Sequence, residues 1–108
     1  MANLEELEKY KKIHMIGIGG VSMSGIAEIL KHWGFSVTGS DAAQSEYTDD
    51  LISHGIPVTI GHDLENVAKS DLVVYTAAIK PDDPELVKAR ELYIPTIERG
   101  DFLGLLTK

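Results

Sequence analysis

A short glycine-rich segment, Gly17-Ile18-Gly19-Gly20, is the part of this sequence best suited to binding an anionic ligand. It follows the apolar run 13–16 and precedes a stretch whose apolar residues recur at helical spacing. Glycine lets the backbone approach a ligand closely, and the free N–H groups and dipole of a helix N-terminus attract phosphate. We therefore predict a diphosphate site formed by Gly17, Gly19, Gly20, Val21, Ser22 and Met23.

The segment departs from the dinucleotide-binding pattern G-x-G-x-x-G, because Ser22 stands where the third glycine belongs. Ser22 could donate its hydroxyl to a phosphate, or it could cap the helix. The plainer alternative for the glycines is a tight turn that lets the helix pack closely on the strand. If phosphate binds there, Gly19→Val should be severely damaging, because a branched side chain would fill the phosphate space and resist a positive φ.

Polar residues at the ends of the other predicted strands could complete the site. Ser40-Asp41 ends the second strand, where dinucleotide-binding proteins hold a ribose hydroxyl, although the same carboxylate could cap a turn. His62 ends the third strand, as a rim contact or as part of a plain surface loop, and Thr76-Ala77-Ala78 follows the fourth. Arg99 follows the fifth strand, where it could reach an anion or remain a solvated surface charge.

The remaining conspicuous side chains indicate packing rather than chemistry. His14 lies inside the first strand and is expected to be an interior histidine with satisfied hydrogen bonds, while Met23 and Trp33 are expected in the core. The sequence has no cysteine, no His/Glu cluster at metal-ligand spacing, no nucleophile elbow and no G-x-x-x-x-G-K-[ST] phosphate loop. The polar groups are therefore predicted to bind a ligand, with no catalytic residue and no metal among them.

The elements that must position these residues alternate along the chain. Strands are expected at 13–16, 35–39, 57–60, 72–75 and 95–97. Helices are expected at 4–10, from 22 to a stop at Gly34, at 46–54 before Gly55, at 65–69, from Pro84 with Asp83 as N-cap, and around 102–106. This alternation predicts an α/β, Rossmann-like, doubly wound sheet of five parallel strands flanked by helices, in the order 3-2-1-4-5. The order reverses between strands 1 and 4, so the ligand crevice is expected there.

Composition limits the classes of partner and compartment. The 108 residues fit one domain, 1–108, and a net charge of −7 without any basic cluster argues against nucleic acid as a partner. No apolar run approaches the roughly 20 residues of a membrane span. Without cysteine or a recognisable signal peptide, a cytoplasmic protein with no membrane partner is expected.

Several segments closely resemble the amino-terminal domain of the Mur ligases of peptidoglycan synthesis. They are Ile13–Ala27, Gly39-Ser40-Asp41, Gly61-His62, Val73–Ile79, Pro84-Glu85 and Ile94–Arg99. The resemblance extends from Lys12 onward, and within the family it is greatest to the members that join L-alanine to UDP-N-acetylmuramic acid.

The resemblance implies a three-domain ligase in which ATP and Mg²⁺ activate the lactyl carboxylate of UDP-N-acetylmuramic acid as an acyl phosphate. The amino acid then displaces phosphate. In this family the first domain holds the UDP group, so 1–108 would be that substrate-binding domain, without the central ATP-binding and C-terminal domains. The expected partners are UDP-N-acetylmuramic acid and the missing domains, and the fragment alone is not expected to be catalytic.

The resemblance also implies a role for each matching position. The backbone of Gly19–Met23 would cradle the diphosphate, and Ser40-Asp41 would hold the uridine, whose N3–H suits a carboxylate. His62 would line the uridine side. Thr76-Ala77-Ala78 would bound the diphosphate or the amino sugar, and Arg99 would reach the sugar–phosphate end.

Three alternatives remain open at the level of sequence. A related ligase that attaches a preformed tripeptide to the same substrate shares these motifs. An NAD-binding regulatory or dehydrogenase half-domain would place Asp41 on the adenosine ribose, although a complete dinucleotide site usually needs a second half. The third alternative is a structural domain that binds no nucleotide.

Overall fold

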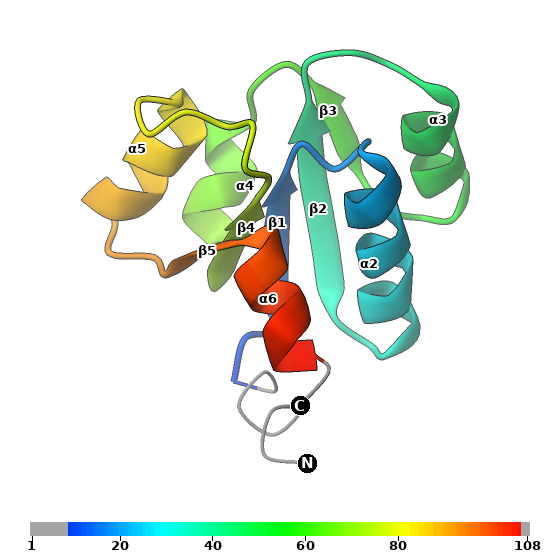
Figure 1. Ribbon diagram of the computed structural model, residues 1–108, viewed down its shortest axis with the longest axis horizontal. Helices are drawn as coiled ribbons and strands as arrows, with labels where there is room; N and C mark the ends of the chain where they lie inside the picture. The colour runs from blue at the N-terminus through cyan, green and yellow to red at the C-terminus, as the bar shows by residue number, and fades with distance from the viewer. Residues whose placement is uncertain (1–8, 107–108) are drawn as a thin grey trace.

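A computed structural model describes residues 9–106, which form one five-stranded parallel sheet flanked by helices (Figure 1). The strands are β1 (Lys12–Ile16), β2 (Ser36–Asp41), β3 (Val58–Ile60), β4 (Leu72–Tyr75) and β5 (Thr96–Glu98). The helices are α2 (Val21–His32), α3 (Glu46–Ser53), α4 (Leu64–Lys69), α5 (Pro84–Glu91) and α6 (Arg99–Leu106). The sheet order β3-β2-β1-β4-β5 confirms the predicted doubly wound arrangement.

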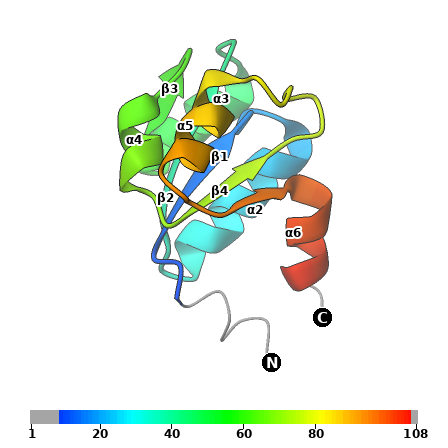
Figure 2. The same cartoon turned by 90° about the vertical axis from the view of Figure 1, so that its left-hand side faces the viewer.

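Two apolar cores lie on opposite faces of the sheet, because side chains alternate along β1. Ile13 and Met15 face a core completed by α2, α3 and α6, whereas Ile16 faces a smaller core shared with α4 and α5. Figures 1 and 2 show the two groups of helices on either side of the sheet. Within residues 9–106, no helix is long and apolar enough to cross a membrane.

Local signals fix the helix boundaries largely as predicted. The apolar stripe of α2 is buried, and Gly34 follows the helix with φ +97°. Helix α3 begins with a capping box between Ser45 and Thr48. Helix α5 begins at Pro84 with the Asp83 carboxylate accepting two backbone N–H groups, which confirms the predicted start.

One expectation about the elements is wrong, and another lies largely outside the described residues. Trp33 is the C-cap residue of α2 and is 48% exposed, so its placement in the core is wrong, whereas Met23 is buried as expected. Trp33 still has right-handed helical dihedral angles, φ −80° and ψ 0°, so its exposure means that little packs against this end of α2. The helix expected at 4–10 lies outside the described residues, apart from Lys9 and Tyr10, which are not helical.

Candidate functional site

The glycine loop crosses from β1 to α2 over the end of β2. The N–H groups of Gly17 and Ile18 both donate to the carbonyl oxygen of Ser40, at 2.8 and 3.0 Å. Gly17 has φ +82°, and a Cβ there would lie 3.2 Å from Cγ2 of Thr76. Glycine is therefore required at this position by the backbone conformation and by the close approach of the β4 end.

Gly19 has a different role from the one expected. Its φ is not positive, and its N–H donates to Oδ2 of Asp41 at 2.9 Å. A Cβ at Gly19 would lie 2.8 Å from that oxygen and from Cγ2 of Thr48. Of the two expected reasons for damage by Gly19→Val, resistance to a positive φ is therefore wrong, and the new side chain would also displace Asp41 and Thr48.

The start of α2 presents backbone donors. The first intrahelical bond runs from the N–H of Ser24 to the carbonyl of Gly20, at 2.8 Å, and no side chain caps the helix. The N–H groups of Val21, Ser22 and Met23 consequently have no acceptor among the described residues. Because the Met23 side chain is buried, only its backbone can contact a ligand there.

Ser22 and Arg99 meet beside these donors. Nη1 of Arg99 lies 3.2 Å from Oγ of Ser22, although 77 residues separate the two in sequence. Ser22 does not cap α2, because the helix begins at Val21 with Gly20 as its N-cap. Of its two predicted roles, the capping role is therefore wrong, and the hydroxyl stays exposed next to a guanidinium.

Asp41 ends β2, and its carboxylate accepts hydrogen bonds from two backbone N–H groups. Oδ2 accepts from Gly19, and Oδ1 accepts from the N–H of Ala43 at 3.2 Å, so the carboxylate does cap the turn that follows the strand. Each carboxylate oxygen has a second lone pair, and Asp41 also lines the adjoining cavity. Turn capping and contact with a ligand are therefore compatible.

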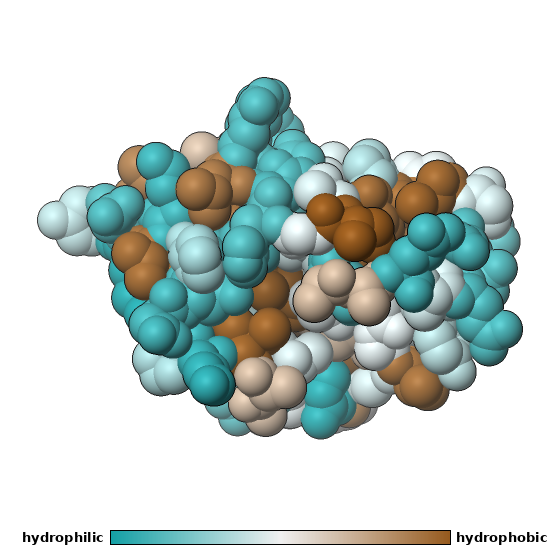
Figure 3. All heavy atoms as spheres, turned by 90° about the horizontal axis from the view of Figure 1, so that it is seen from above, coloured by the Kyte–Doolittle hydropathy of each residue, from teal (hydrophilic) through white to brown (hydrophobic). Residues whose placement is uncertain are grey.

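A cavity of about 510 Å³ opens at the carboxyl ends of β1, β2 and β4. Figure 3 views this end of the molecule and shows a hollow near its middle, with apolar surface inside it. Seven predicted residues line the cavity: Gly17, Gly20, Ser40, Asp41, His62, Thr76 and Ala78. Six do not line it: Gly19, Val21, Ser22, Met23, Ala77 and Arg99. Most of the second group belong to the α2 start or bond to it, so the site has two adjoining parts.

The lining also includes residues that sequence reasoning missed. These are Ile16, Ala42, Gly61, Asp83 and Glu85. Glu85 is the most consequential, because its carboxylate is buried, with 1% of its surface exposed, directly beneath the cavity. The predicted helix start at Asp83-Pro84 placed Glu85 in a first turn, but nothing in the sequence indicated that this side chain points inward.

Four donors surround the Glu85 carboxylate. Oε1 lies 2.8 Å from Nε2 of His14 and 3.2 Å from the N–H of Asp63. Oε2 lies 2.7 Å from Oγ of Ser40 and 3.4 Å from Nδ1 of His62. The other ring nitrogen of His14 lies 2.8 Å from Oγ1 of Thr38, which confirms the expectation of an interior histidine with satisfied hydrogen bonds.

These donors keep Glu85 ionised despite its burial. Burial raises the pKa of the Glu85 carboxyl, but hydrogen bonds from His14 and Ser40, with smaller contributions from the charge of His14 and from His62, bring the pKa below its ordinary value. An ionised carboxylate only accepts hydrogen bonds. Nε2 of His14 and Nδ1 of His62 must therefore carry the hydrogens that point to Glu85.

Charge is divided unevenly across the two parts of the site. Three carboxylates line the cavity, from Asp41, Asp83 and Glu85, and no lysine or arginine lines it. The α2 start, in contrast, offers free N–H groups, the positive end of the helix dipole and Arg99. The cavity suits a neutral group rich in O–H and N–H donors, and the α2 start suits an anion.

The cavity also contains a cluster that resembles a metal site. One ligand atom each from His62, Asp83 and Glu85 lies within 4.8 Å of the others, a grouping that sequence spacing did not reveal. Both Glu85 oxygens already accept hydrogen bonds, and the Nδ1 hydrogen of His62 points to one of them. A cation such as Mg²⁺ would have to displace these bonds, so this arrangement fits a metal poorly.

Comparison with known proteins gives a consistent result. The model of the Mur ligase family, catalytic domain, matches residues 12–108. A UDP-N-acetylmuramate–L-alanine ligase of Acetivibrio thermocellus is 54% identical over 100 residues, which is 93% of this chain and 21% of that protein. The chain thus spans about a fifth of the length of the curated relatives it matches.

Solved structures agree with the sequence relatives. A UDP-N-acetylmuramate–alanine ligase from Thermotoga maritima superposes with a TM-score of 0.82 at 38% identity, covering 85% of this chain and 21% of that one. A murein peptide ligase from Psychrobacter arcticus gives a TM-score of 0.79 at 26% identity, covering 87% and 20%.

Proposed function

The chain belongs to the Mur ligase family, and on that premise we propose that it binds the UDP group of UDP-N-acetylmuramic acid for an ATP-dependent ligase that adds L-alanine in peptidoglycan synthesis. The observation that carries this proposal is the set of N–H groups of Val21, Ser22 and Met23, which have no acceptor among the described residues and follow Gly20, a residue that lines the acidic cavity. Backbone donors at a helix N-terminus are a recurrent solution for binding diphosphates.

The nucleoside occupies the acidic cavity in this proposal. Uracil presents an N3–H and ribose presents hydroxyl groups, and all of these donate to carboxylates or to the Ser40 hydroxyl. Asp41 is the natural partner for one of them, because it lines the cavity beside the glycine loop and keeps lone pairs beyond its two backbone bonds.

The diphosphate lies over the start of α2 in this proposal. The three cavity carboxylates repel phosphate, whereas the N–H groups, the helix dipole and Arg99 attract it. Ser22 then adds a hydroxyl donor. The amino sugar extends past Thr76-Ala77-Ala78, at the end of β4, towards the rest of the ligase.

The chemistry of amide formation belongs to other parts of the whole enzyme in this proposal. ATP and Mg²⁺ supply the acyl-phosphate activation, and residues of the central and C-terminal domains bind them and the amino acid. In this division of labour the present chain binds, orients and presents the substrate.

A ligase that attaches a preformed peptide is the second candidate. Two solved structures of such ligases support it, at 26% and 36% identity, against 38% for the solved L-alanine ligase and 54% for the L-alanine ligase relative found by sequence. Both candidates share the UDP site, so they are distinguished by the acceptor that the whole enzyme uses.

A thermal-shift experiment tests the proposal against NAD binding. UDP-N-acetylmuramic acid at 100 times its Kd should stabilise the chain by about 2.7 kcal/mol, and NAD should leave the Tm unchanged. Stabilisation by NAD without stabilisation by the UDP-sugar would favour a dinucleotide half-domain. An unchanged Tm with every nucleotide would favour a structural domain.

A further inference from the structure

The buried Glu85 carboxylate joins four parts of the fold at one point. It bonds to His14 in β1, to Ser40 in β2 and to His62 and Asp63 in the loop between β3 and α4, while Glu85 itself lies in the first turn of α5. No buried polar side-chain atom among the described residues lacks a hydrogen-bond partner. The network is therefore complete before any ligand binds.

His62 is the member of this network that reaches the surface. Its side chain is 52% exposed and lines the cavity, and its one side-chain hydrogen bond among the described residues is with the buried Glu85. An exposed imidazole without such a partner would sample several rotamers. The contact with Glu85 restricts the ring to the rim of the cavity.

We infer that Glu85 is a positioning residue for nucleotide binding, which acts by holding His62 at the rim of the cavity. The inference rests on the proposed function, because it assumes that the nucleoside occupies this cavity. Glu85 borders the cavity, but it is nearly fully buried and both of its oxygens already accept hydrogen bonds from the protein, so it acts through its partners. Preorganised contacts raise affinity because less side-chain entropy is lost on binding.

Glu85→Gln is the sharpest variant, because it keeps the shape of the side chain. One carboxylate oxygen becomes an NH₂ donor, so the four surrounding donors can no longer all be accepted. We expect UDP to bind about tenfold more weakly to this variant. We also expect changed imidazole ¹⁵N signals for His62 in the ligand-free protein, because its Nδ1 hydrogen loses a charged acceptor.

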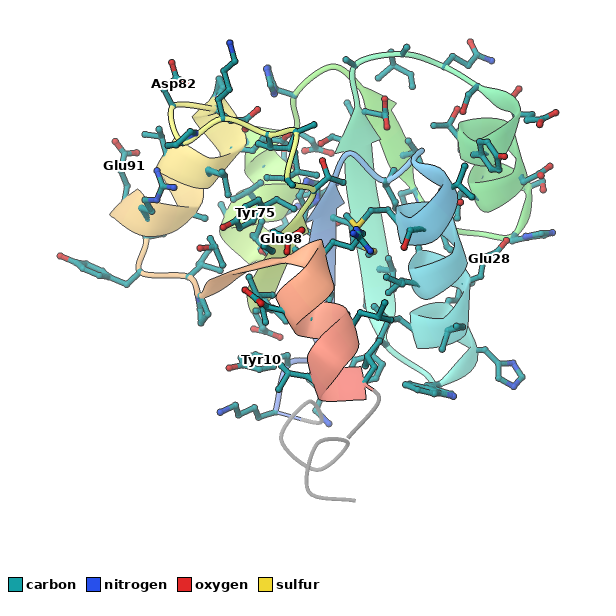
Figure 4. All side chains as sticks on the ribbon, viewed as in Figure 1. Tyr10, Glu28, Tyr75, Asp82, Glu91 and Glu98 are labelled. Carbon is teal, nitrogen blue, oxygen red and sulfur yellow. The ribbon has the colours of Figure 1, made fainter. Side chains whose placement is uncertain are left out.

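Two control variants lie on the same helix. Glu91→Gln makes the same chemical change on an exposed side chain, which points away from the sheet (Figure 4), and should leave UDP affinity unchanged. Leu86→Val trims a buried side chain of the smaller core. It should lower stability and leave affinity unchanged, which separates positioning from a general loss of stability.

A double-mutant cycle with His62→Ala tests the route of the effect. If Glu85 acts through His62, Glu85→Gln should cost about tenfold in the parent and less than threefold in the His62→Ala background. Equal costs in both backgrounds, or full UDP affinity in Glu85→Gln, would overturn the inference. If the parent chain itself fails to bind UDP, the proposed function fails. The His62 signals test the inference without any ligand: if they are unchanged in Glu85→Gln, Glu85 does not hold that ring.

Discussion

Individual carboxylates shape the crevice at the end of the sheet. Asp41 holds the glycine loop through Gly19 and its own turn through Ala43, and Glu85 holds the opposite wall through His14 and His62. Both carboxylates are therefore hydrogen-bonded to the protein in the absence of a ligand. Substitution of either carboxylate should change both the affinity for the ligand and the free energy of unfolding, and the two can be measured independently.

Asp41→Ala should weaken the binding of UDP-N-acetylmuramic acid by tenfold or more, since a hydrogen bond to a charged group contributes about 1.5–3 kcal/mol. The variant should also lose some stability, because the N–H of Gly19 loses its acceptor. Isothermal titration calorimetry and urea denaturation measure the two effects. Asp82→Ala is a suitable control, because Asp82 is exposed, points outward (Figure 4) and does not line the cavity. Equal affinity of Asp41→Ala and Asp82→Ala would remove Asp41 from the site.

Stability should fall in acid because of Glu85. Its pKa in the folded protein lies below the ordinary value of 4.5, so the unfolded chain binds more protons and stability rises with pH. The contribution of Glu85 is complete above about pH 4.5 and is lost as the pH falls through the lower folded pKa. Asp63, whose pKa is lowered in spite of burial by its hydrogen bonds to Asn66 and Thr59, adds in the same direction.

Urea denaturation between about pH 3 and pH 7 measures this dependence. The urea midpoint of the parent should fall more steeply below pH 4.5 than that of Glu85→Gln, which lacks the titrating group. Parallel pH profiles for the two proteins would show that Glu85 does not contribute to acid sensitivity.

At the scale of elements, close packing between the β1–α2 connection and β2 sets the geometry of the loop. A Cβ at Gly39, in the middle of β2, would lie 2.7 Å from Cβ of Ile18 and closer still to the end of that side chain. Ile18 is fully buried, so it has no free space into which to move. The loop keeps its position over β2 because residue 39 has no side chain.

Gly39→Ala should therefore destabilise the protein by about 1–3 kcal/mol, as overpacked core positions do. Gly25→Ala is the matched control, because Gly25 lies within α2 and a Cβ there would meet nothing within 4 Å. It should stabilise the protein by about 0.5–1 kcal/mol through helix propensity. Thermal or urea denaturation of both variants checks the contrast, and equal effects of the same sign would contradict it.

Short-range signals made the elements predictable, while long-range contacts decided the site. The Asp83-Pro84 start of α5 and the stripe of α2 depend on neighbours within one or two turns, so the sequence revealed both. Glu85 meets His14 across 71 residues and Ser40 across 45, and no local pattern encodes such pairs. Trp33 was misplaced for a related reason: the spacing of an apolar stripe does not show whether distant parts of the chain cover the last side chain of a helix.

On the scale of the whole molecule, the reversal of strand order creates one crevice whose two parts differ in charge. The protein carries a net charge of −7, yet the start of α2 remains attractive to an anion, because its donors are backbone groups. The proposed function accordingly assigns the diphosphate and the nucleoside to neighbouring but separate surfaces. On that proposal, the division of charge would fix the direction in which a UDP-sugar lies.

An NMR titration of the ¹⁵N-labelled chain with UDP-N-acetylmuramic acid tests the placement of the diphosphate most directly. The backbone amide signals of Val21, Ser22 and Met23 should shift the most, because their N–H groups gain phosphate acceptors, with smaller shifts along the cavity. A folded, saturated protein in which these three amides do not move, or in which the shifts gather on another face, would contradict binding of the diphosphate at the start of α2.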